Sequence, residues 1–392
     1  MKQILAITGM NIRTILQRSG ASIVIIIGIA GSVAVMVSLL AMAEGLNKTI
    51  ASTGQEDRAL IFREGSNSEL SSGIAMTDLA IIENTQGIKK SEDGPMIAAE
   101  IFTIIDVKKK GAVDTSNLPL RGVQEMSFKI RPELKIIEGV NFFPGRGEVI
   151  VGKGAASEYE GLEIGKPIKI RDSEWTVVGI FSTGGDVHES EVWADLAVIQ
   201  GAFRRGASAS IAIVQMEKNA SITDFAATLE LDPRLNLKVQ GEADFYLEQS
   251  SGASVVIQAF GYAVAIIMAI GAVFAALNTM YSAVSTRLVE IGTLRAVGFH
   301  GSSVLFALMI ESMFLALLGG LLGAGLSYLI FNGYTVSTLA SVSFTQTAFD
   351  FAVTGEIIGQ GLILALIVGF LGGLLPARRA ATQEITEALR AI

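Results

Sequence analysis

The stretch SIVIIIGIAGSVAVMVSLLAMA, residues 22–43, decides the fold because it contains no charged residue and is long enough to cross a membrane as one helix. A spanning α-helix needs about 20 consecutive, mostly apolar residues. Three further windows of this kind follow, around residues 254–281, 303–331 and 357–375. The sequence therefore predicts four transmembrane helices, which fits a chain that is 50% hydrophobic, 17% charged and has a mean hydropathy of +0.51.

The first window also resembles a signal peptide, since Ala41, Met42 and Ala43 stand where a signal peptidase would cut. A cleaved signal has an apolar core of about 7–15 residues, and this window is longer. We therefore expect an uncleaved membrane anchor at residues 21–44. The preceding residues 1–20 mix apolar and basic side chains, which predicts an amphipathic helix on the cytoplasmic face of the membrane.

The basic residues of the short segments predict the orientation of the helices. Lys and Arg occur before the first window, in residues 282–301 and in the tail 377–392, whereas residues 332–356 contain neither. Short loops rich in Lys and Arg stay in the cytoplasm. We therefore expect both termini and residues 282–301 inside the cell and residues 45–252 and 332–356 outside it. The expected location is the inner (plasma) membrane of a bacterial cell.

The long segment 45–252 predicts a folded α+β domain. Short β-branched runs bounded by glycine are typical of strands, and apolar spacing after a polar cap residue is typical of helices. The expected strands are residues 148–151, 167–170, 175–181 and 235–239, and the expected helices are residues 78–86 and 222–231. Asp78 and either Ser221 or Thr223 are the expected helix caps. Residues 242–249 also suit a helix, which would lead into the second window as one continuous element.

These predictions divide the chain into successive segments. They are an amphipathic helix (1–20), a first transmembrane helix (21–44), the external α+β domain (45–252), a second transmembrane helix (253–281), a cytoplasmic loop or helix (282–301), a third transmembrane helix (302–331), a short external loop (332–356), a fourth transmembrane helix (357–376) and a cytoplasmic tail (377–392). The acidic excess behind the net charge of −8 lies in the external domain without a basic stripe, which argues against nucleic-acid binding.

The residues that enzymes and metal sites need are scarce. The chain has no cysteine, which excludes disulfides, thiol nucleophiles and cysteine-ligated metals, and its two histidines lie far apart. His188 stands in an acidic run, where a polar loop is favoured over a metal site because no second histidine is near. Residues 147–154, GEVIVGKG, resemble a P-loop but lack its spacing and its Ser or Thr. We therefore predict no catalytic residue, no metal site and no nucleotide-binding site in this chain.

Four glycines and one carboxylate stand out within the predicted transmembrane helices. Gly319 and Gly323 in the third helix, and Gly369 and Gly373 in the fourth, have the four-residue spacing of close helix packing. This spacing fits either packing within the chain or a dimer face. Glu311 lies in the third helix, where a buried carboxylate is costly. Because no basic partner is visible within the helices, a hydrogen bond between helices is favoured over a proton or substrate contact.

Residues 286–299, TRLVEIGTLRAVGF, form the most specific stretch of the chain. Arg287 and Glu290 have the i, i+3 spacing of a helical pair, and apolar residues are interleaved with the charges. A short charged helix with an apolar side, exposed to the cytoplasm, suits a docking surface. The residues predicted to form this surface are Arg287, Glu290, Ile291, Gly292, Leu294, Arg295 and Gly298.

This stretch resembles the Arg…Glu-Ile-Gly…Leu-Arg-Ala…Gly motif of the MacB/FtsX family of ABC transporter permeases. The resemblance continues in Glu311-Ser312, in the run GFLGGLLPARRAA at residues 369–381, and in residues 147–181 of the external domain. The proline that is usual near the end of the family's sequences is missing here, where Ile385 stands, which affects only the tail. The chain is thus identified as a member of the family (type VII) without a fused ATPase.

The resemblance implies a permease subunit that works by mechanotransmission: ATP hydrolysis on a partner drives export or extraction of an amphiphilic substrate, such as a drug, peptide, lipid or lipoprotein. It implies that residues 287–298 couple to an ABC ATPase, which binds the ATP and Mg, and that this chain forms a homodimer and is not itself an enzyme. Further expected partners are a periplasmic adaptor (membrane fusion protein) and an outer-membrane channel. The alternative is an FtsX-like signal transmitter that regulates an extracytoplasmic cell-wall hydrolase.

Overall fold

The structure, a computed structural model, describes residues 3–4, 7–10, 19–339 and 346–390. The chain forms two compact units. We call the first the membrane unit, which comprises Met1–Glu44, Val255–Tyr334 and Phe351–Ile392. The second, the sheet unit, comprises Gly45–Ser254 and Thr335–Asp350. The amphipathic helix predicted for residues 1–20 lies largely outside the described residues.

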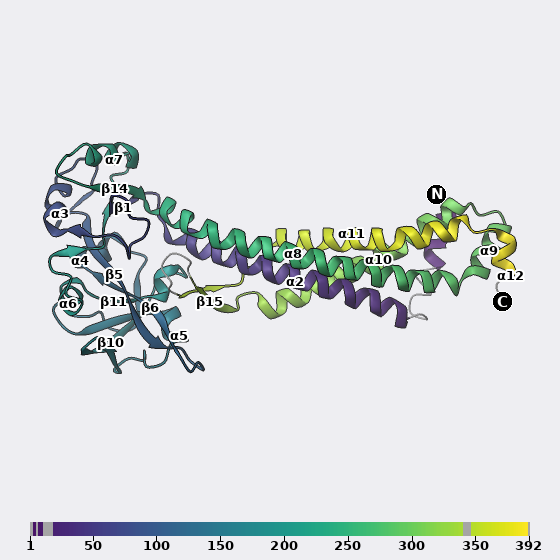
Figure 1. The fold of residues 1–392 in the computed structure, drawn as a ribbon, viewed down its shortest axis with the longest axis horizontal. Helices are drawn as coiled ribbons and strands as arrows, with labels where there is room; N and C mark the ends of the chain where they lie inside the picture. Colours follow the sequence, from purple (N-terminus) through teal and green to yellow (C-terminus); the bar gives the residue numbers. More distant parts are fainter. Residues whose placement is uncertain (1–2, 5–6, 11–18, 340–345, 391–392) are drawn as a thin grey trace. The chain divides into compact units, whose positions relative to one another are not determined.

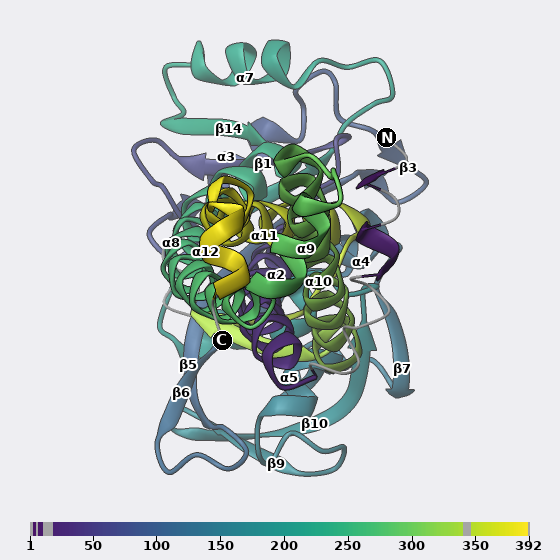
Figure 2. The ribbon, with the colours of Figure 1, turned by 90° about the vertical axis from the view of Figure 1, so that its right-hand side faces the viewer.

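Four long helices dominate the membrane unit within the described part of the chain (Figure 1, Figure 2). They are α2 (Ser19–Thr53), α8 (Glu242–Ser285), α10 (Gly301–Phe331) and α11 (Gly355–Thr382). Each is long and apolar enough to cross a membrane, which confirms the four predicted transmembrane helices. Both α2 and α8 also contain residues of the sheet unit, and α8 includes residues 242–249 as predicted.

Small and branched side chains fill the inside of this bundle, whereas large apolar side chains cover its outside. One buried cluster takes residues from all four helices, among them Ile29, Val33, Ala276, Ala316 and Ala365. The side chains that are more than half exposed include Phe260, Ile267 and Phe274 of α8 and Leu329 of α10. An apolar outer surface of this kind suits the hydrocarbon of a membrane, where the helices satisfy their own backbone hydrogen bonds. Two short helices follow long ones: α9 (Leu288–Ala296) after α8, and α12 (Ile385–Arg390) after α11.

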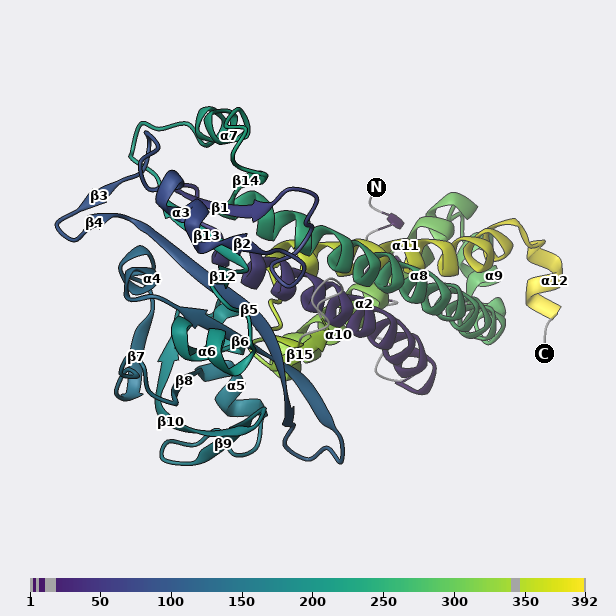
Figure 3. The same cartoon turned by 60° about the vertical axis from the view of Figure 1, so that its left-hand side comes forward.

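A ten-stranded mixed sheet forms the centre of the sheet unit, among the residues that the structure describes (Figure 3). Its order is β14-β1-β13-β5-β6-β11-β8-β10-β7, and β9 pairs with β10. The strands are β1 (Arg58–Arg63), β5 (Ile97–Lys108), β6 (Thr115–Val123), β7 (Lys135–Gly139), β8 (Glu148–Gly152), β9 (Pro167–Ile170), β10 (Ser173–Ser182), β11 (Val192–Asp195), β13 (Ile211–Gln215) and β14 (Leu237–Gly241).

Short helices and small strand pairs surround this sheet. The helices are α3 (Met76–Ile82), α4 (Glu125–Ile130), α5 (Lys153–Glu158), the 3-10 helix η2 (Val187–Ser190), α6 (Leu196–Ala202) and α7 (Ile222–Glu230). The small strand pairs are β2 (Ile74–Ala75) with β12 (Ser208–Ala209), and β3 (Lys90–Ser91) with β4 (Gly94–Pro95).

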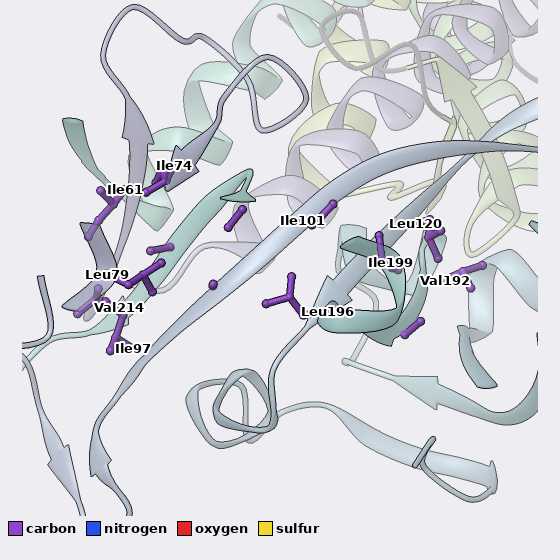
Figure 4. Packing of buried hydrophobic residues seen from close by; sticks show 14 of the residues in the cluster. Ile61, Ile74, Leu79, Ile97, Ile101, Leu120, Val192, Leu196, Ile199 and Val214 are labelled. Atoms are coloured by element: carbon purple, nitrogen blue, oxygen red, sulfur yellow. The ribbon is translucent and has the colours of Figure 1, made fainter. Parts of the chain in front are cut away.

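Strand β5 joins the two halves of the sheet because its two ends pair with different strands. Its first residues, from Ile97, pair with β13, and its residues from Ile101 onward pair with β6. Buried apolar residues lie along β5, from Ile97 to Leu120, Leu196 and Ile199 (Figure 4). The pairs β6–β11 and β8–β10 are parallel, and the other pairs of the sheet are antiparallel. Together with its helices, this core confirms the predicted α+β domain.

Most of the local predictions for this domain agree with the structure. The strands predicted at residues 148–151, 167–170 and 175–181 are β8, β9 and β10 with slightly different ends. Ser221 caps α7, since its Oγ accepts a hydrogen bond from the Asp224 N–H at 3.2 Å. The cap predicted at Asp78 is wrong: α3 begins after Ala75, so Asp78 lies in the first turn, where a negative charge favours the helix N-terminus.

Residues 332–356, predicted as a short external loop, contain a β-hairpin of β15 (Thr335–Leu339) and β16 (Gln346–Asp350). The hairpin belongs to the sheet unit. The Ala348 N–H donates a hydrogen bond to Ser190 Oγ at 2.9 Å, and the Lys109 ammonium donates one to Ser337 Oγ. The loop prediction is therefore incomplete, because the connection between α10 and α11 contributes to the folded domain.

Candidate functional site

The predicted docking stretch forms a short helix, α9, between α8 and α10. Ile291 and Gly292 lie on its buried side, whereas Glu290 is exposed. Gly298 follows the helix with φ of +106°, a left-handed conformation that glycine adopts without strain. The Phe299 N–H then donates to the Leu294 carbonyl at 3.1 Å, which closes the helix end. The sequence predicts Gly298 as part of the docking surface, and the structure places it as the residue that turns the chain toward α10.

Arg295 connects α9 to the C-terminal part of the membrane unit. Its guanidinium donates a hydrogen bond to the carbonyl oxygen of Gln383, just before α12. The side chain of Leu294 instead lines a cavity beside α9. Arg295 therefore has a structural partner within the chain, and Glu290 lies on the exposed side of α9.

A cavity of about 360 Å³ opens beside α9. Its lining is mostly apolar and comes from α9, α10 and the helical residues 7–10: Ile7, Met10, Arg287, Val289, Glu290, Ile291, Thr293, Leu294, Val304 and Leu308. Such a cavity accepts an apolar side chain, and Glu290 places a carboxylate beside it. The cavity could not be predicted from sequence, because residues 7–10 join its wall from a distant part of the chain.

Glu311 is hydrogen-bonded, as favoured from the sequence, and its partner is a basic residue outside the predicted transmembrane helices. Arg287 Nη1 lies 3.2 Å from Glu311 Oε2, and the two side chains are only 5% and 8% exposed. Arg287 stands at the turn between α8 and α9, outside the predicted transmembrane helices. A basic partner at this turn does not show in the sequence of the helices themselves. The pair ties the start of α9 to α10.

The four glycines of the helix-packing motifs all pack within the chain. An added Cβ at Gly319 or Gly323 would lie 2.9 or 2.4 Å from a backbone carbonyl oxygen of α2. At Gly369 it would lie 2.4 Å from the Cβ of Ala316, and at Gly373 it would lie 2.7 Å from the Cβ of Ser312, both on α10. Of the two alternatives that the sequence left open, the structure thus places these residues in the interior of the bundle.

Gly323 and Gly325 offer a matched test of this packing. Gly323→Ala is expected to destabilise the chain by about 1–3 kcal/mol, because the new methyl group meets backbone atoms of α2 that cannot rotate away. Gly325→Ala meets nothing within 4 Å and is expected to leave the stability unchanged or slightly raised. Thermal unfolding of the detergent-solubilised chain, followed by circular dichroism, measures both. Equal melting temperatures for the two variants would contradict the assigned packing.

The sheet unit contains a buried ionic cluster around Arg121. Its guanidinium bonds Glu69, Glu100 and Glu191 at 2.7–3.1 Å, and Glu191 also accepts from Trp193 Nε1 at 2.7 Å. Burial alone would raise the pKa of Glu100, but Arg131 and Arg121 outweigh it and lower that pKa to about 2. No sequence pattern reveals this cluster, because its members lie on separate elements.

The sequence predicts a polar loop around His188, and the structure shows the short 3-10 helix η2 there. Its side chain is 1% exposed, and Nδ1 lies 3.3 Å from Asp186 Oδ2. Burial tends to lower the pKa of His188, yet Asp186 and Glu191 outweigh it and the pKa is raised. The acidic run around His188 therefore contributes to the buried part of the domain. Asp186 accepts a hydrogen bond from the His188 N–H at 2.9 Å and caps η2.

A groove of about 710 Å³ lies on the sheet unit. Its basic lining residues are Arg58, Lys89, Lys129 and Lys135, and its apolar ones are Met96, Ile130, Pro132 and Ile137. Asp57 and Glu133 add two carboxylates. The mixture of apolar and charged walls suits an amphiphilic ligand better than a purely apolar one.

Two family models match the chain. The MacB-like periplasmic core domain matches residues 22–231, and the FtsX-like permease C-terminal domain matches residues 262–385. The first match covers α2 and most of the sheet unit, and the second covers α9, α10 and α11.

Curated proteins with similar sequences are ABC transporter permeases. The chain is 26% identical to an uncharacterized ABC transporter permease of Methanocaldococcus jannaschii, over 62% of this chain and 61% of that protein. It is 34% identical to the macrolide export ATP-binding/permease protein MacB of Vibrio parahaemolyticus, over 32% of this chain and 18% of that protein. The chain covers less than two thirds of the length of each of these relatives.

Two solved structures of transporter domains also match part of the chain. One is the extracellular domain of the noncanonic ABC-type transporter YknZ from Gram-positive bacteria, with a TM-score of 0.36 and 17% identity, over 47% of this chain and 100% of that chain. Another is the periplasmic region of MacB from Actinobacillus actinomycetemcomitans, with a TM-score of 0.38 and 11% identity, over 53% of this chain and 98% of that chain.

The periplasmic core model alone spans more than half of the 392 residues. The permease model spans the region that contains α9 and the Arg287–Glu311 pair. With four helices long enough to cross a membrane, this is a multi-pass membrane protein. The chain belongs to the MacB/FtsX family of ABC transporter permeases.

Proposed function

We propose that this chain is the membrane subunit of an ABC transporter and works by mechanotransmission. A partner ATPase binds ATP and Mg, docks on α9 and moves the helices, and the helices move the sheet unit. The observation that carries the proposal is α8, a single 44-residue helix that starts in the sheet unit and ends directly before α9. Because a helix is stiff along its axis, we expect a displacement at the α9 end of α8 to be passed along this helix.

The orientation belongs to the same proposal. Basic residues in the short segments support a cytoplasmic position for α9 and both termini, where ATP is available, and a position of the sheet unit on the outer side of the inner membrane. The chain acts as a homodimer, and it supplies no nucleotide-binding or catalytic residues of its own. A periplasmic adaptor and an outer-membrane channel complete the assembly where the cell has an outer membrane.

The proposed substrate is amphiphilic and is exported or extracted on the outer side. The groove of the sheet unit supports this, since Ile137 and Met96 line it together with lysines. Names of relatives point the same way: one is a macrolide export protein, and another, from Pseudomonas syringae, is a probable syringafactin export protein. If the assembled complex instead activates a cell-wall hydrolase and moves no amphiphile, the FtsX-like role replaces export.

Glu290→Ala tests the docking surface. Glu290 is exposed on α9 and lines the cavity there, so its loss is expected to weaken binding of the partner ATPase about tenfold, roughly 1.4 kcal/mol. Co-purification of the tagged ATPase with the full chain, and ATP hydrolysis by the complex, measure the effect. Glu356→Ala is the matched control, because Glu356 is also exposed but lies in the first turn of α11. Wild-type binding and coupling in the Glu290 variant would remove the docking assignment.

A further inference from the structure

We propose that Glu242, the first residue of α8, is a positioning residue that changes its ion-pair partners when α8 moves, and so passes the movement of α8 to β1 and to the groove. The inference rests on the proposed function, since it assumes that α8 moves during the ATP cycle. It concerns residues of the sheet unit alone.

The ends of α2 and α8 are in direct backbone contact within the sheet unit. A Cβ added to Gly54, just after α2, would lie 2.3 Å from the Cα of Ala243 in the first turn of α8. The N–H of Gln55 donates to Glu242 Oε2 at 3.1 Å, and the Val187 N–H donates to Thr53 Oγ1 at 3.1 Å. The end of α2 and the start of α8 therefore contact each other and the folded domain, and Glu242 lies at this contact.

Glu242 is fully buried, yet its carboxylate is poorly satisfied. Its Oε2 lies 3.6 Å from Arg58 Nη1, and its Oε1 lies 3.9 Å from Arg131 Nη2. Both distances are too long for hydrogen bonds. Oε1 has no hydrogen-bond partner among the described residues. A buried carboxylate left in this way is costly, so its present position is only weakly favoured.

Both arginines are occupied by other carboxylates. Arg58 bonds Glu133 with two nitrogens at 2.6 and 2.9 Å, and Arg131 bonds Glu100 with two nitrogens at 2.5 and 3.2 Å. Yet the Nε of each arginine lacks a hydrogen-bond partner in the part of the chain that the structure describes. Each guanidinium thus keeps one nitrogen that no carboxylate of the described residues occupies. A shift of about 1 Å at the start of α8 would bring Glu242 within hydrogen-bond distance of either guanidinium.

A change of partner by Arg58, from Glu133 to Glu242, would affect both β1 and the groove. Arg58 is the first residue of β1, which pairs with both β13 and β14. Glu133 lines the 710 Å³ groove, and its side chain is 28% exposed, so it can turn to solvent when Arg58 leaves it. When Arg58 pairs with Glu242, an unpaired Glu133 carboxylate faces the groove. The groove is then more negatively charged, which lowers its affinity for an anionic ligand.

A purely structural ionic cluster would look different. In a static cluster, buried polar atoms are expected to be satisfied, as they are around Arg121. Here Glu242 Oε1 is unsatisfied among the described residues, and the carboxylate lies 3.6 and 3.9 Å from two arginines that other carboxylates already occupy. That pattern is typical of an element with two arrangements of similar free energy, which a small displacement can exchange.

Spin labels on the full chain with its partner ATPase in nanodiscs test the inference. The chain has no native cysteine, so Leu247→Cys on α8 and Glu138→Cys on β7 take the labels specifically. Electron paramagnetic resonance then measures the distance between them, without nucleotide and with ATP trapped. Wild type is expected to change its distance distribution. Glu242→Gln, which keeps the shape but removes the charge, is expected to lose at least half of that change while ATP is still hydrolysed.

Two further variants make the outcome decisive. Glu133→Gln removes the competing partner of Arg58 and is expected to favour the Glu242–Arg58 pair, so its nucleotide-free distribution differs from that of Glu242→Gln. Asp244→Asn, an exposed carboxylate in the same first turn, is the control and is expected to respond as wild type does. A full response in both Glu242→Gln and Glu133→Gln would overturn the inference.

The same data separate this inference from the proposed function. If the wild-type distance ignores nucleotide although the complex hydrolyses ATP, mechanotransmission through α8 is contradicted. In that case the label-to-label distance distributions of Glu242→Gln and Glu133→Gln without nucleotide still test whether Glu242 changes its ion-pair partners. Different distributions support it, and identical ones overturn it.

Discussion

Arg121→Ala is expected to prevent stable folding of the sheet unit. Arg121 is the shared partner of three buried carboxylates, and of these three Glu100 also pairs with a second arginine, Arg131. Glu69 and Glu191 then lose the arginine that both of them bond, and Glu191 keeps the hydrogen bond from Trp193 Nε1. Breaking one buried ion pair in this way costs about 3–5 kcal/mol. Whole domains are stable by about 5–15 kcal/mol, so the loss of two such pairs removes most or all of that margin.

Tryptophan fluorescence of the full chain measures this effect selectively. The chain has two tryptophans, Trp175 and Trp193, and both are buried in the sheet unit. Their emission during urea or thermal unfolding therefore reports on that unit, while the membrane unit contributes none. Arg121→Ala is expected to show the exposed-tryptophan emission without denaturant.

Arg146→Ala is the matched control. Arg146 also faces a carboxylate, Glu148 at 3.5 Å, but its side chain is 65% exposed. Because water already solvates this pair, its loss is expected to change the stability by less than about 1 kcal/mol. A folded Arg121→Ala variant with the unfolding midpoint of Arg146→Ala would show that the cluster does not hold the domain together.

The contrast between these two arginines shows where sequence reasoning reaches its limit. The four transmembrane helices follow from composition over about 20 residues, a local property that each window carries by itself. The strands at residues 148–181 were predictable for the same reason, since β-branched runs and glycines mark them locally. Arg121 and its carboxylates are spread over residues 69–191, and only the pairing of strands brings them together.

The site shows the same division. Residues 286–299 predicted a charged helix, and α9 is that helix. The 360 Å³ cavity beside it depends on Ile7 and Leu308 as well, which no pattern within α9 reveals. Glycine spacing predicted close packing, but the choice between bundle interior and dimer face needed the neighbours of Gly323 and Gly369. Sequence thus located the surfaces that one element forms, and missed those that several elements form together.

Arg287→Ala is expected to be the most damaging single change in the membrane unit. It leaves Glu311 buried at 6% exposure inside α10 without the cation that lies 3.2 Å away. The expected cost is about 3–5 kcal/mol, as for other broken buried pairs. Circular dichroism of the detergent-solubilised chain during heating measures the loss. Arg378→Ala, which removes an exposed arginine from the end of α11, is expected to melt as wild type does.

The double variant Arg287→Ala/Glu311→Ala distinguishes a true pair from two independent contributions. Without either charge, no uncompensated ion remains in the bundle, so the double variant is expected to be more stable than Arg287→Ala alone. A stability loss equal to the sum of the two single losses would contradict direct coupling.

The double variant also separates stability from function. Since the pair ties the start of α9 to α10, the double variant is expected to retain the bound ATPase through the exposed face of α9, yet to couple hydrolysis to movement less efficiently than wild type.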